Sequence, residues 1–455
     1  FNINEPVIFG SPIVMNPILF FPFVVAPMVN ATIAWFAASS GLIGKVISLV
    51  PWTAPAPIGA AWGAGWMVSS ALLVLVLLLI LATSSVLIND LVQRSTIRSN
   101  HRTQQSLALA KETLIGWSAA NQKIPGQLPC PEDLSLIGTP NEGNAANTCS
   151  NNAVLVGRLP WRTLRLPDLR DDFGEKLWYA LSPGFRSSPI NSDTLGLLSI
   201  DGVTNSAVAV VFSPGPPIAE QSRPVPTASQ PPDIAQYLEG GNATSDNAFI
   251  TAGDPADFND RALIITARDL FNVVEKRVGR EVRKALLDYF CGSDNFDAGG
   301  NCISSGGERF FPRPAAFSDA TCLGTSAINT ECKSDSTSSR GRLPANPTTS
   351  WATLSLARGT TGPSPDWLQK NGWRELIYYA VAEECTDGTF DCSTGGLTLQ
   401  QPPAAPITNQ RFIIVLSGSA LSSTSPVQTR TPLTKKSKES NYFEDENATP
   451  LDNTF

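Results

Sequence analysis

The residues of this chain that are best suited to chemistry are eight cysteines, one histidine and a few carboxylates. The cysteines fall in close sequential couples, namely Cys130 with Cys149, Cys291 with Cys302, Cys322 with Cys332, and Cys385 with Cys392. An even count, loop-rich surroundings and the lack of a Cys-x-x-Cys motif predict local disulfides, formed in an oxidising compartment. Unpaired buried thiols are the alternative interpretation.

His101 is the only histidine, which nearly excludes histidine-based metal sites and Ser-His-Asp or Cys-His catalysis. Calcium prefers oxygen ligands, and weak candidates for such ligands are Glu239, Asp246 and Asp452. We favour turns and helix caps at these positions. The expectation is therefore a non-enzymatic protein without a cofactor, with Ca²⁺ as the open alternative.

Charge is distributed very unevenly along the 455 residues. Between Glu5 and Asp90 the only charged residue is Lys45, whereas the rest of the chain is polar. The run from Met67 to Ile88 has no charge, and at about 1.5 Å per residue its length matches a hydrocarbon core of about 30 Å. We therefore predict a transmembrane helix there, with the lipid bilayer as a partner. The net charge of −7 and the scattered basic residues argue against nucleic acid.

Three motifs stand in order near the N-terminus, and they are Asn4-Glu5-Pro6, a proline-spaced apolar segment that includes Pro17, and Pro51-Trp52-Thr53. Together they resemble the C-terminal part of the membrane subunit (IIC) of lactose/cellobiose-type phosphotransferase-system permeases. The resemblance covers about residues 1–66. It implies a sugar and the cytoplasmic phosphotransferase subunits as partners.

In that family the glutamate of the Asn-Glu-Pro motif contacts the sugar, which implies a sugar-binding role for Glu5 beside Asn4. A lone carboxylate within a membrane is costly and hence a functional candidate, and it can accept hydrogen bonds from two adjacent hydroxyls. A glutamate at a helix end is the alternative. The substrate-binding histidine and most helices of the family precede this motif, so we expect no transport by this segment alone.

A second resemblance follows the uncharged run. Apolar spacing continues a helix from Met67 to about Ala120, and Pro125-Gly126 ends it. A half-embedded helix of this kind resembles type IV pilins and type II secretion pseudopilins. Segments similar to bacterial prepilin-type proteins include Leu128-Pro129-Cys130-Pro131, Gly157-Arg158-Leu159-Pro160-Trp161 and Leu177-Trp178-Tyr179-Ala180. Gly65-Trp66 aligns with the processing signal of that family. Ser70 replaces its usual glutamate, which counts against cleavage and filament assembly.

An internal repeat follows. Gly157-Arg158-Leu159-Pro160 recurs as Gly341-Arg342-Leu343-Pro344, and the Tyr-x-Glu triplet at Tyr237 recurs at Tyr442. Two further segments recur in the same order, Leu177–Leu181 as Ile377–Val381 and Val211–Ser213 as Val415–Ser417. In the second copy, the apolar stripe of a leading helix comprises Leu270, Phe271, Val273, Val274, Val278, Val282, Leu286, Leu287 and Phe290.

The expected fold class is therefore membrane plus α+β. It comprises an IIC-like fragment (1–66), a pilin-like stem helix (67–120) and two pilin-like α+β modules with short antiparallel sheets (104–255 and 260–455). The predicted function is a membrane-anchored structural protein of the bacterial inner membrane, with a periplasmic soluble part and other pilin-like subunits as partners. It would carry the permease segment by a join of two genes, through recombination or an assembly error, near residues 62–75. The alternative is a membrane component of a sugar phosphotransferase system.

Overall fold

The computed structural model describes residues 28–29, 31–32, 35–36, 38–41, 68–150, 152–218, 221–244, 246–323, 332, 334–335, 337–344, 367–386, 392–401, 403–422, 427–431 and 433–444. The chain divides into two compact units, Phe1–Asn100 and His101–Phe455. Most of the predicted permease segment, including Asn4 and Glu5, lies outside the described residues, as does Asp452.

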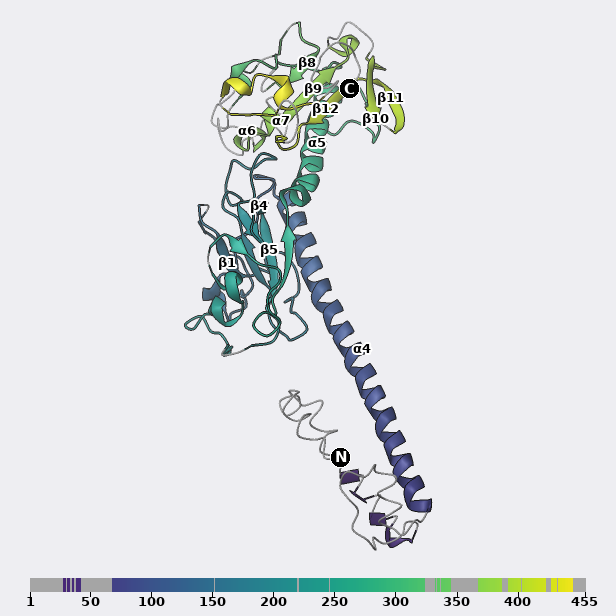
Figure 1. Ribbon diagram of the computed structural model, residues 1–455. Coiled ribbons are helices and arrows are strands. Elements are labelled where there is room, and N and C mark those ends of the chain that lie inside the picture. Colours follow the sequence, from purple (N-terminus) through teal and green to yellow (C-terminus); the bar gives the residue numbers. More distant parts are fainter. Residues whose placement is uncertain are drawn as a thin grey trace. The chain divides into compact units, whose positions relative to one another are not determined.

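The longest helix is α4 (Val68–Ala120), which begins in the first unit and ends in the second (Figure 1). No helix within the described ranges combines the length and apolarity needed to cross a bilayer. The transmembrane helix predicted from Met67 to Ile88 stays a prediction. In the second unit, α4 buries a stripe with helical spacing that comprises Thr103, Leu107, Ala110, Leu114 and Ser118.

The first sheet of the second unit has four antiparallel strands in the order β1-β2-β5-β7. The strands are β1 (Leu155–Arg158), β2 (Trp178–Leu181), β5 (Ala209–Ser213) and β7 (Arg261–Ile265). Strand alternation divides β2 and β5 between two apolar clusters. Tyr179 and Val211 lie in the larger cluster together with Leu107, Ala110 and Leu114 of α4, whereas Trp178 and Phe212 belong to the smaller one.

A second sheet has the order β4-β3-β6. It is formed by β3 (Leu198–Ile200), β4 (Val203–Ala207) and β6 (Ala248–Phe249), and β3 pairs in parallel with β6. Phe249 belongs to the smaller apolar cluster with Tyr237 and Leu238. The Tyr-x-Glu segment is therefore packed against the side of the first sheet that the larger cluster does not occupy.

Helix α5 (Ala267–Cys291) follows β7 directly. Its first turn is stabilised by a capping box, because the Thr266 side chain accepts from Asp269 N and the Asp269 side chain accepts from Thr266 N. The predicted apolar stripe of this helix is buried except at Val273, which is 40% exposed. The sheet register places β7 beside β5, so the first sheet extends past the predicted boundary near residues 255–260.

After α5 come β8 (Arg340–Arg342), α6 (Trp367–Lys370), α7 (Trp373–Leu376) and β9 (Ile377–Val381). A hairpin of β10 (Leu397–Gln401) and β11 (Ala404–Gln410) precedes β12 (Phe412–Leu416). The short 3₁₀ helices are Leu134–Leu136, Ile234–Gln236, Gly240–Ala243, Ala320–Cys322, Glu383–Cys385, Leu433–Lys435 and Glu439–Asn441. Strands β12, β9 and β8 form an antiparallel sheet in that order.

The sheet β12-β9-β8 repeats the pairing of β5-β2-β1. Tyr179 pairs with Gly157 and Val211, and Tyr379 pairs with Gly341 and Ile414. The equivalent of Val211 is thus Ile414, one residue before the Val415 that the sequence match suggests. Both tyrosine hydroxyls donate to a proline carbonyl, Tyr179 to Pro129 and Tyr379 to Pro312. We refer to the two halves as the first module (His101–Ile265) and the second module (Thr266–Phe455).

Candidate functional site

A dense set of polar contacts in the first module surrounds Arg223. Its Nε donates to the Gln236 carbonyl at 2.7 Å, Nη1 to the Gly215 carbonyl at 2.7 Å, and Nη2 to Gln221 Oε1 at 2.7 Å. The guanidinium lies 5.0 Å from the ring centroid of Tyr237. Gln221 also donates from Nε2 to Glu239 Oε1 at 2.7 Å. These contacts link the Tyr-x-Glu triplet to a Gln-x-Arg triplet, and we call the arrangement the first latch.

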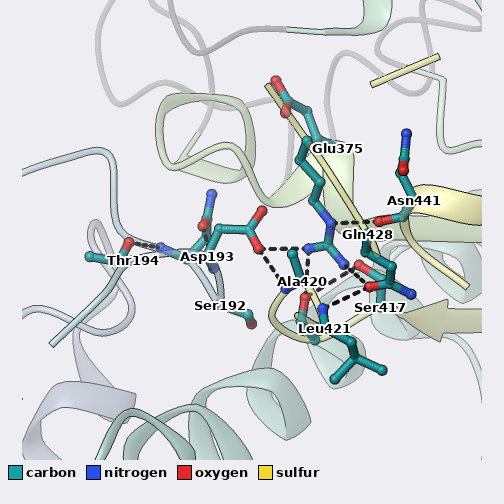
Figure 2. A network of polar contacts seen from close by, with 12 residues as sticks. Ser192, Asp193, Thr194, Glu375, Ser417, Ala420, Leu421, Gln428 and Asn441 are labelled. Atoms are coloured by element: carbon teal, nitrogen blue, oxygen red, sulfur yellow. Dashed lines mark hydrogen bonds and ion pairs between the residues drawn. The ribbon is translucent and has the colours of Figure 1, made fainter. Parts of the chain in front are cut away.

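The same contacts recur in the second module around Arg430. Its Nε donates to the Asn441 carbonyl at 2.9 Å, Nη1 to the Gly418 carbonyl at 2.8 Å, and Nη2 to Gln428 Oε1 at 3.4 Å. The guanidinium lies 4.5 Å from the Tyr442 ring centroid, and Gln428 Nε2 donates to Glu444. This is the second latch. Figure 2 shows Asp193 and Asn441 on opposite sides of its network.

A second arginine lies near each of the two latch tyrosines, and it comes from the Gly-Arg-Leu-Pro motif. The Arg158 guanidinium lies 5.7 Å from the Tyr237 ring centroid, and that of Arg342 lies 5.3 Å from the Tyr442 ring centroid. Arg342 is completely buried and donates to three backbone carbonyls, those of Phe317, Glu375 and Lys436. Two motifs that are distant in sequence therefore meet at one aromatic ring in each module.

The glycine of this motif is required by close packing. A Cβ at Gly157 would lie 2.8 Å from Pro131 Cβ, and one at Gly341 would lie 2.1 Å from the Ala315 carbonyl oxygen. Both distances are below van der Waals contact, so only glycine allows the neighbouring segment to approach at this point. The recurring Gly-Arg pair thus combines a close backbone approach with a buried cation.

The two latches differ in the carboxylate that lies beside the arginine. In the first latch, Arg223 Nη1 lies 3.4 Å from Oε1 of Glu175, within the same module. In the second, Arg430 Nη1 lies 2.7 Å from Oδ1 of Asp193, which belongs to the first module. Figure 2 shows this contact together with the Ala420 backbone N–H, which donates to the same oxygen at 3.1 Å. The second latch therefore also joins the two modules.

Asn371 forms a further junction between the modules. Its Oδ1 accepts from Ser188 Oγ at 2.9 Å and Ile190 N at 3.2 Å, and its Nδ2 donates to the Lys123 carbonyl at 3.2 Å. Asn371 is completely buried, so each of these bonds replaces a bond to water. Ser192 Oγ also donates to Glu275 Oε1 at 2.6 Å. Such a set of directional contacts favours one relative placement of the modules within this unit.

A buried pair of carboxyl groups lies beneath the first latch. Asp260 Oδ2 accepts from Glu239 N at 3.0 Å and Asn242 Nδ2 at 2.9 Å, while Glu239 Oε2 accepts from Asp260 N at 3.1 Å. Among the described residues, Asp260 Oδ1 has no hydrogen-bond partner. Burial, together with the neighbouring Glu239 carboxylate, raises the pKa of Asp260 to about 8.

Two of the three calcium candidates, Glu239 and Asp246, accept hydrogen bonds from protein donors. Both Glu239 oxygens accept hydrogen bonds, one from Gln221 and the other from the Asn259 and Asp260 amides. Asp246 Oδ1 accepts from Ala248 N at 2.9 Å, as a turn residue does. In the described ranges, no group of three or more His, Cys, Asp or Glu side chains could hold a metal ion.

The predicted disulfides are confirmed. Cys130 bonds to Cys149, Cys291 to Cys302, Cys322 to Cys332, and Cys385 to Cys392. The described chain contains no free cysteine. Each bond closes a short local loop, so these bonds stiffen segments within a module and do not link the two modules.

Sequence reasoning found the tyrosines, the glutamates and the Gly-Arg-Leu-Pro arginines, but it missed Arg223, Arg430, Asp193 and Asp260. A signal for the first two was present, because Gln221-Ser222-Arg223 and Gln428-Thr429-Arg430 share the pattern Gln-x-Arg ahead of the repeated Tyr-x-Glu triplet. No comparable pattern marks Asp193 or Asp260, whose roles depend on contacts between distant segments.

Comparison with known proteins adds information about a short part of the chain. It is similar to the lichenan permease IIC component of Bacillus subtilis, with 46% identity over 74 residues, which is 16% of each chain. It is also similar to the lactose-specific EIICB component of the phosphotransferase system of Streptococcus mutans, with 42% identity over 80 residues, or 18% of this chain and 14% of the relative. The cellobiose-specific EIIC component of Lactococcus lactis is 46% identical over 66 residues, or 14% of this chain and 13% of the relative.

No family model and no solved structure matches the chain. The chain spans less than a fifth of the length of these curated relatives. The matches support the predicted similarity to lactose/cellobiose-type IIC components over about 80 residues, and they give no support to the pilin resemblance. A segment of this chain is thus related to IIC components of sugar phosphotransferase systems.

Proposed function

We propose that the chain is a non-enzymatic, pilin- or pseudopilin-like structural protein attached to the bacterial inner membrane, with residues 101–455 exposed outside the cytoplasm. In this proposal the sugar-permease segment is an N-terminal fusion. The observation that carries the proposal is the set of four disulfides, because such bonds persist in oxidising compartments and are rare in the cytosol.

The architecture of the second unit also supports a structural role. The apolar stripe of α4 packs against an antiparallel sheet, which is the arrangement expected for a pilin-like module. In the two latches, Arg223 and Arg430 donate to backbone carbonyls and lie against the tyrosine rings, so these contacts stiffen the modules. A duplicated module with a bonded junction is suited to a structural role.

The compartment can be tested on cysteine thiols. Cells that produce the full chain are treated with a thiol-alkylating reagent before and after reduction, and the labelled cysteines are identified by mass spectrometry. We expect all eight cysteines to be labelled only after reduction. Labelling of all eight before reduction would contradict the extracytoplasmic location. Protease accessibility in spheroplasts, with a cytoplasmic protein as control, reports the exposed side independently.

A second candidate function rests on the sequence identity of 38–48% to phosphotransferase-system components. In this alternative the chain is a membrane component of a phosphoenolpyruvate-dependent system for lactose- or cellobiose-type sugars. Glu5, with Asn4, would then bind sugar hydroxyls through charge-assisted hydrogen bonds.

This alternative is tested by cellobiose and lactose binding to the purified full chain, with Glu5→Gln as the variant. Saturable binding that the variant reduces would support it, and equal binding by both proteins would remove Glu5 from the site. Glu112→Gln, in the α4 segment of the second unit, is a matched control. Long sequencing reads across the junction near residue 66 would separate a true gene fusion from an assembly error.

A further inference from the structure

A groove in the second module is lined by four cationic side chains together with amide and apolar ones. Its lining comes from α5, β12 and the β10–β11 hairpin, its volume is about 660 Å³, and it is bordered by Lys276, Arg280, Arg283 and Arg411. Figure 1 labels these four elements in the second module. This volume falls within the range of about 300–1,000 Å³ that is usual for small-molecule sites. The latches, the carboxyl pair and the predicted calcium residues are not part of its lining.

The cations on α5 share one face of the helix. Lys276, Arg280 and Arg283 follow each other at spacings of four and three residues, which places them on one side. All three are exposed, and none forms an ion pair with a described acidic residue. Like charges at these spacings oppose helix formation. A row of this kind, beside a groove, is stabilised when an anion is bound.

Arg411 adds a half-buried cation from the opposite wall. Its guanidinium lies 5.1 Å from the Phe290 ring centroid and 5.9 Å from that of Phe311, and Nη2 donates to the Gly300 carbonyl at 2.5 Å. Burial, and then repulsion from Arg283, lowers the pKa of Arg411. The rings and the carbonyl therefore hold the guanidinium in place although a second cation lies close to it.

Arg283 and Arg411 converge on one point of the loop after α5. A Cβ built on Gly300 would lie 3.3 Å from Nη2 of each arginine. The acidic residue that acts on Arg411 is Asp297, whose oxygens already accept from Asn301 N at 2.8 Å and Asn301 Nδ2 at 3.1 Å. Arg283 Nη2 also donates to the Ala298 carbonyl at 3.3 Å, so each guanidinium is held by a carbonyl of this loop. Two guanidinium groups held close together are typical binding partners of a phosphate, sulfate or carboxylate group.

The remaining lining has complementary chemistry. Amide and hydroxyl donors come from Asn301, Asn409, Gln410 and Ser393, while Leu399, Phe412, Ile414 and Leu416 contribute apolar surface. Two disulfides constrain segments that line the groove. Cys291–Cys302 closes the loop that contains Gly300, and Cys385–Cys392 ends next to Ser393. A cationic end, neutral donors and an apolar patch suit an anion carried on a small carbon skeleton.

We propose that this groove binds a small organic oxyanion, with the anionic group between Arg283 and Arg411 and its carbon skeleton on Leu399, Phe412 and Leu416. Phosphate monoesters, sulfate monoesters and carboxylates share the oxyanion chemistry that these side chains recognise. The proposed site is separate from the structural role of the modules and does not depend on it.

The test uses isothermal titration of the purified full chain with benzyl phosphate, inorganic phosphate and benzyl alcohol. We expect saturable binding of benzyl phosphate, weaker binding of inorganic phosphate and no binding of the uncharged alcohol. Binding of benzyl phosphate should also weaken as salt concentration rises. Equal binding of benzyl phosphate and benzyl alcohol, or no saturable binding of benzyl phosphate, would overturn the proposal.

The matched variants are Arg283→Gln, in the groove, and Arg268→Gln, which is exposed elsewhere on α5. Loss of one charge-assisted bond predicts that Arg283→Gln weakens benzyl phosphate binding by about tenfold or more, whereas Arg268→Gln has no effect. Because Arg283 is exposed, this change should leave the fold intact, which circular dichroism verifies. Arg411→Gln gives a second readout, with thermal unfolding to measure its effect on packing. Equal affinities in the Arg283 and Arg268 variants would contradict the proposed site.

Discussion

Arg430 of the second module lies 2.7 Å from Asp193 of the first, measured from Nη1 to Oδ1. Its remaining donors bind the Asn441 and Gly418 carbonyls and Gln428, all within the second module. In the equivalent position of the first module, Arg223 has Glu175 as its carboxylate partner. The corresponding Glu375 of the second module pairs with Lys436 at 2.5 Å. The arginine–carboxylate contact therefore stays within one module in the first copy, whereas in the second copy it links the two modules.

The first prediction concerns this link. Arg430→Gln leaves Asp193 and two carbonyls without their buried donor, so we expect the free energy of unfolding to fall by about 2–4 kcal/mol. Asp193→Asn keeps an acceptor and should cost about 1 kcal/mol. Urea unfolding of each variant and of the double variant measures the coupling. Additive losses in the double variant would show that the two side chains do not interact, and Arg268→Gln is the neutral control.

The second prediction concerns glycine packing at the recurring Gly-Arg pair. Gly341→Ala places a methyl group against the Ala315 carbonyl oxygen, so we expect a loss of about 1–3 kcal/mol through strain. Gly116→Ala, in α4, meets no atom within 4 Å and should stabilise the helix by up to about 1 kcal/mol. Thermal unfolding of the pair gives the comparison. A stabilising effect of Gly341→Ala would contradict the packing argument.

The third prediction concerns pH. The pKa of Asp260 rises from its ordinary value of 3.8 to about 8 in the folded protein. Between these values the folded chain retains a proton that the unfolded chain has released, so the free energy of unfolding falls as pH rises through this window. The slope for one such group is at most about 1.4 kcal/mol per pH unit.

Asp260→Asn imitates the protonated form and keeps one carbonyl oxygen for Glu239 N and Asn242. We therefore expect the variant to lose most of this pH dependence and to be more stable than the parent near pH 9. Denaturant unfolding at pH 5, 7 and 9 measures both proteins. If the parent becomes more stable from pH 5 to 9 and the variant follows it in parallel, the raised pKa is wrong.

The fourth prediction concerns the disulfides. Cys130–Cys149 spans 19 residues and Cys385–Cys392 spans seven. If loop entropy in the unfolded chain dominates, paired replacement by alanine should cost about 1 kcal/mol more for the longer loop than for the shorter one. Urea unfolding under non-reducing conditions compares the two double variants. The reverse order would show that packing around the cysteines, and not loop length, sets the effect.

Local spacing along the chain is enough to determine several features of this protein. The disulfide couples lie at most 19 residues apart, so a simple rule of proximity finds them. The α5 stripe follows helical periodicity, and the repeated Gly-Arg-Leu-Pro and Tyr-x-Glu motifs mark equivalent positions in the two modules. The resemblance to IIC components can likewise be found from the sequence, because its motifs are short and contiguous.

Only the tertiary structure decided the contacts between distant segments. It placed β7 in the first sheet, shifted the strand equivalence by one residue, and brought Arg430 to Asp193 and Arg283 to Arg411. These pairs have no local signature, because ion pairs and buried carboxyl groups depend on which chain segments the packed core brings together. Burial then determines the chemistry, since removal of water changes the pKa of Asp260 and the strength of each arginine contact.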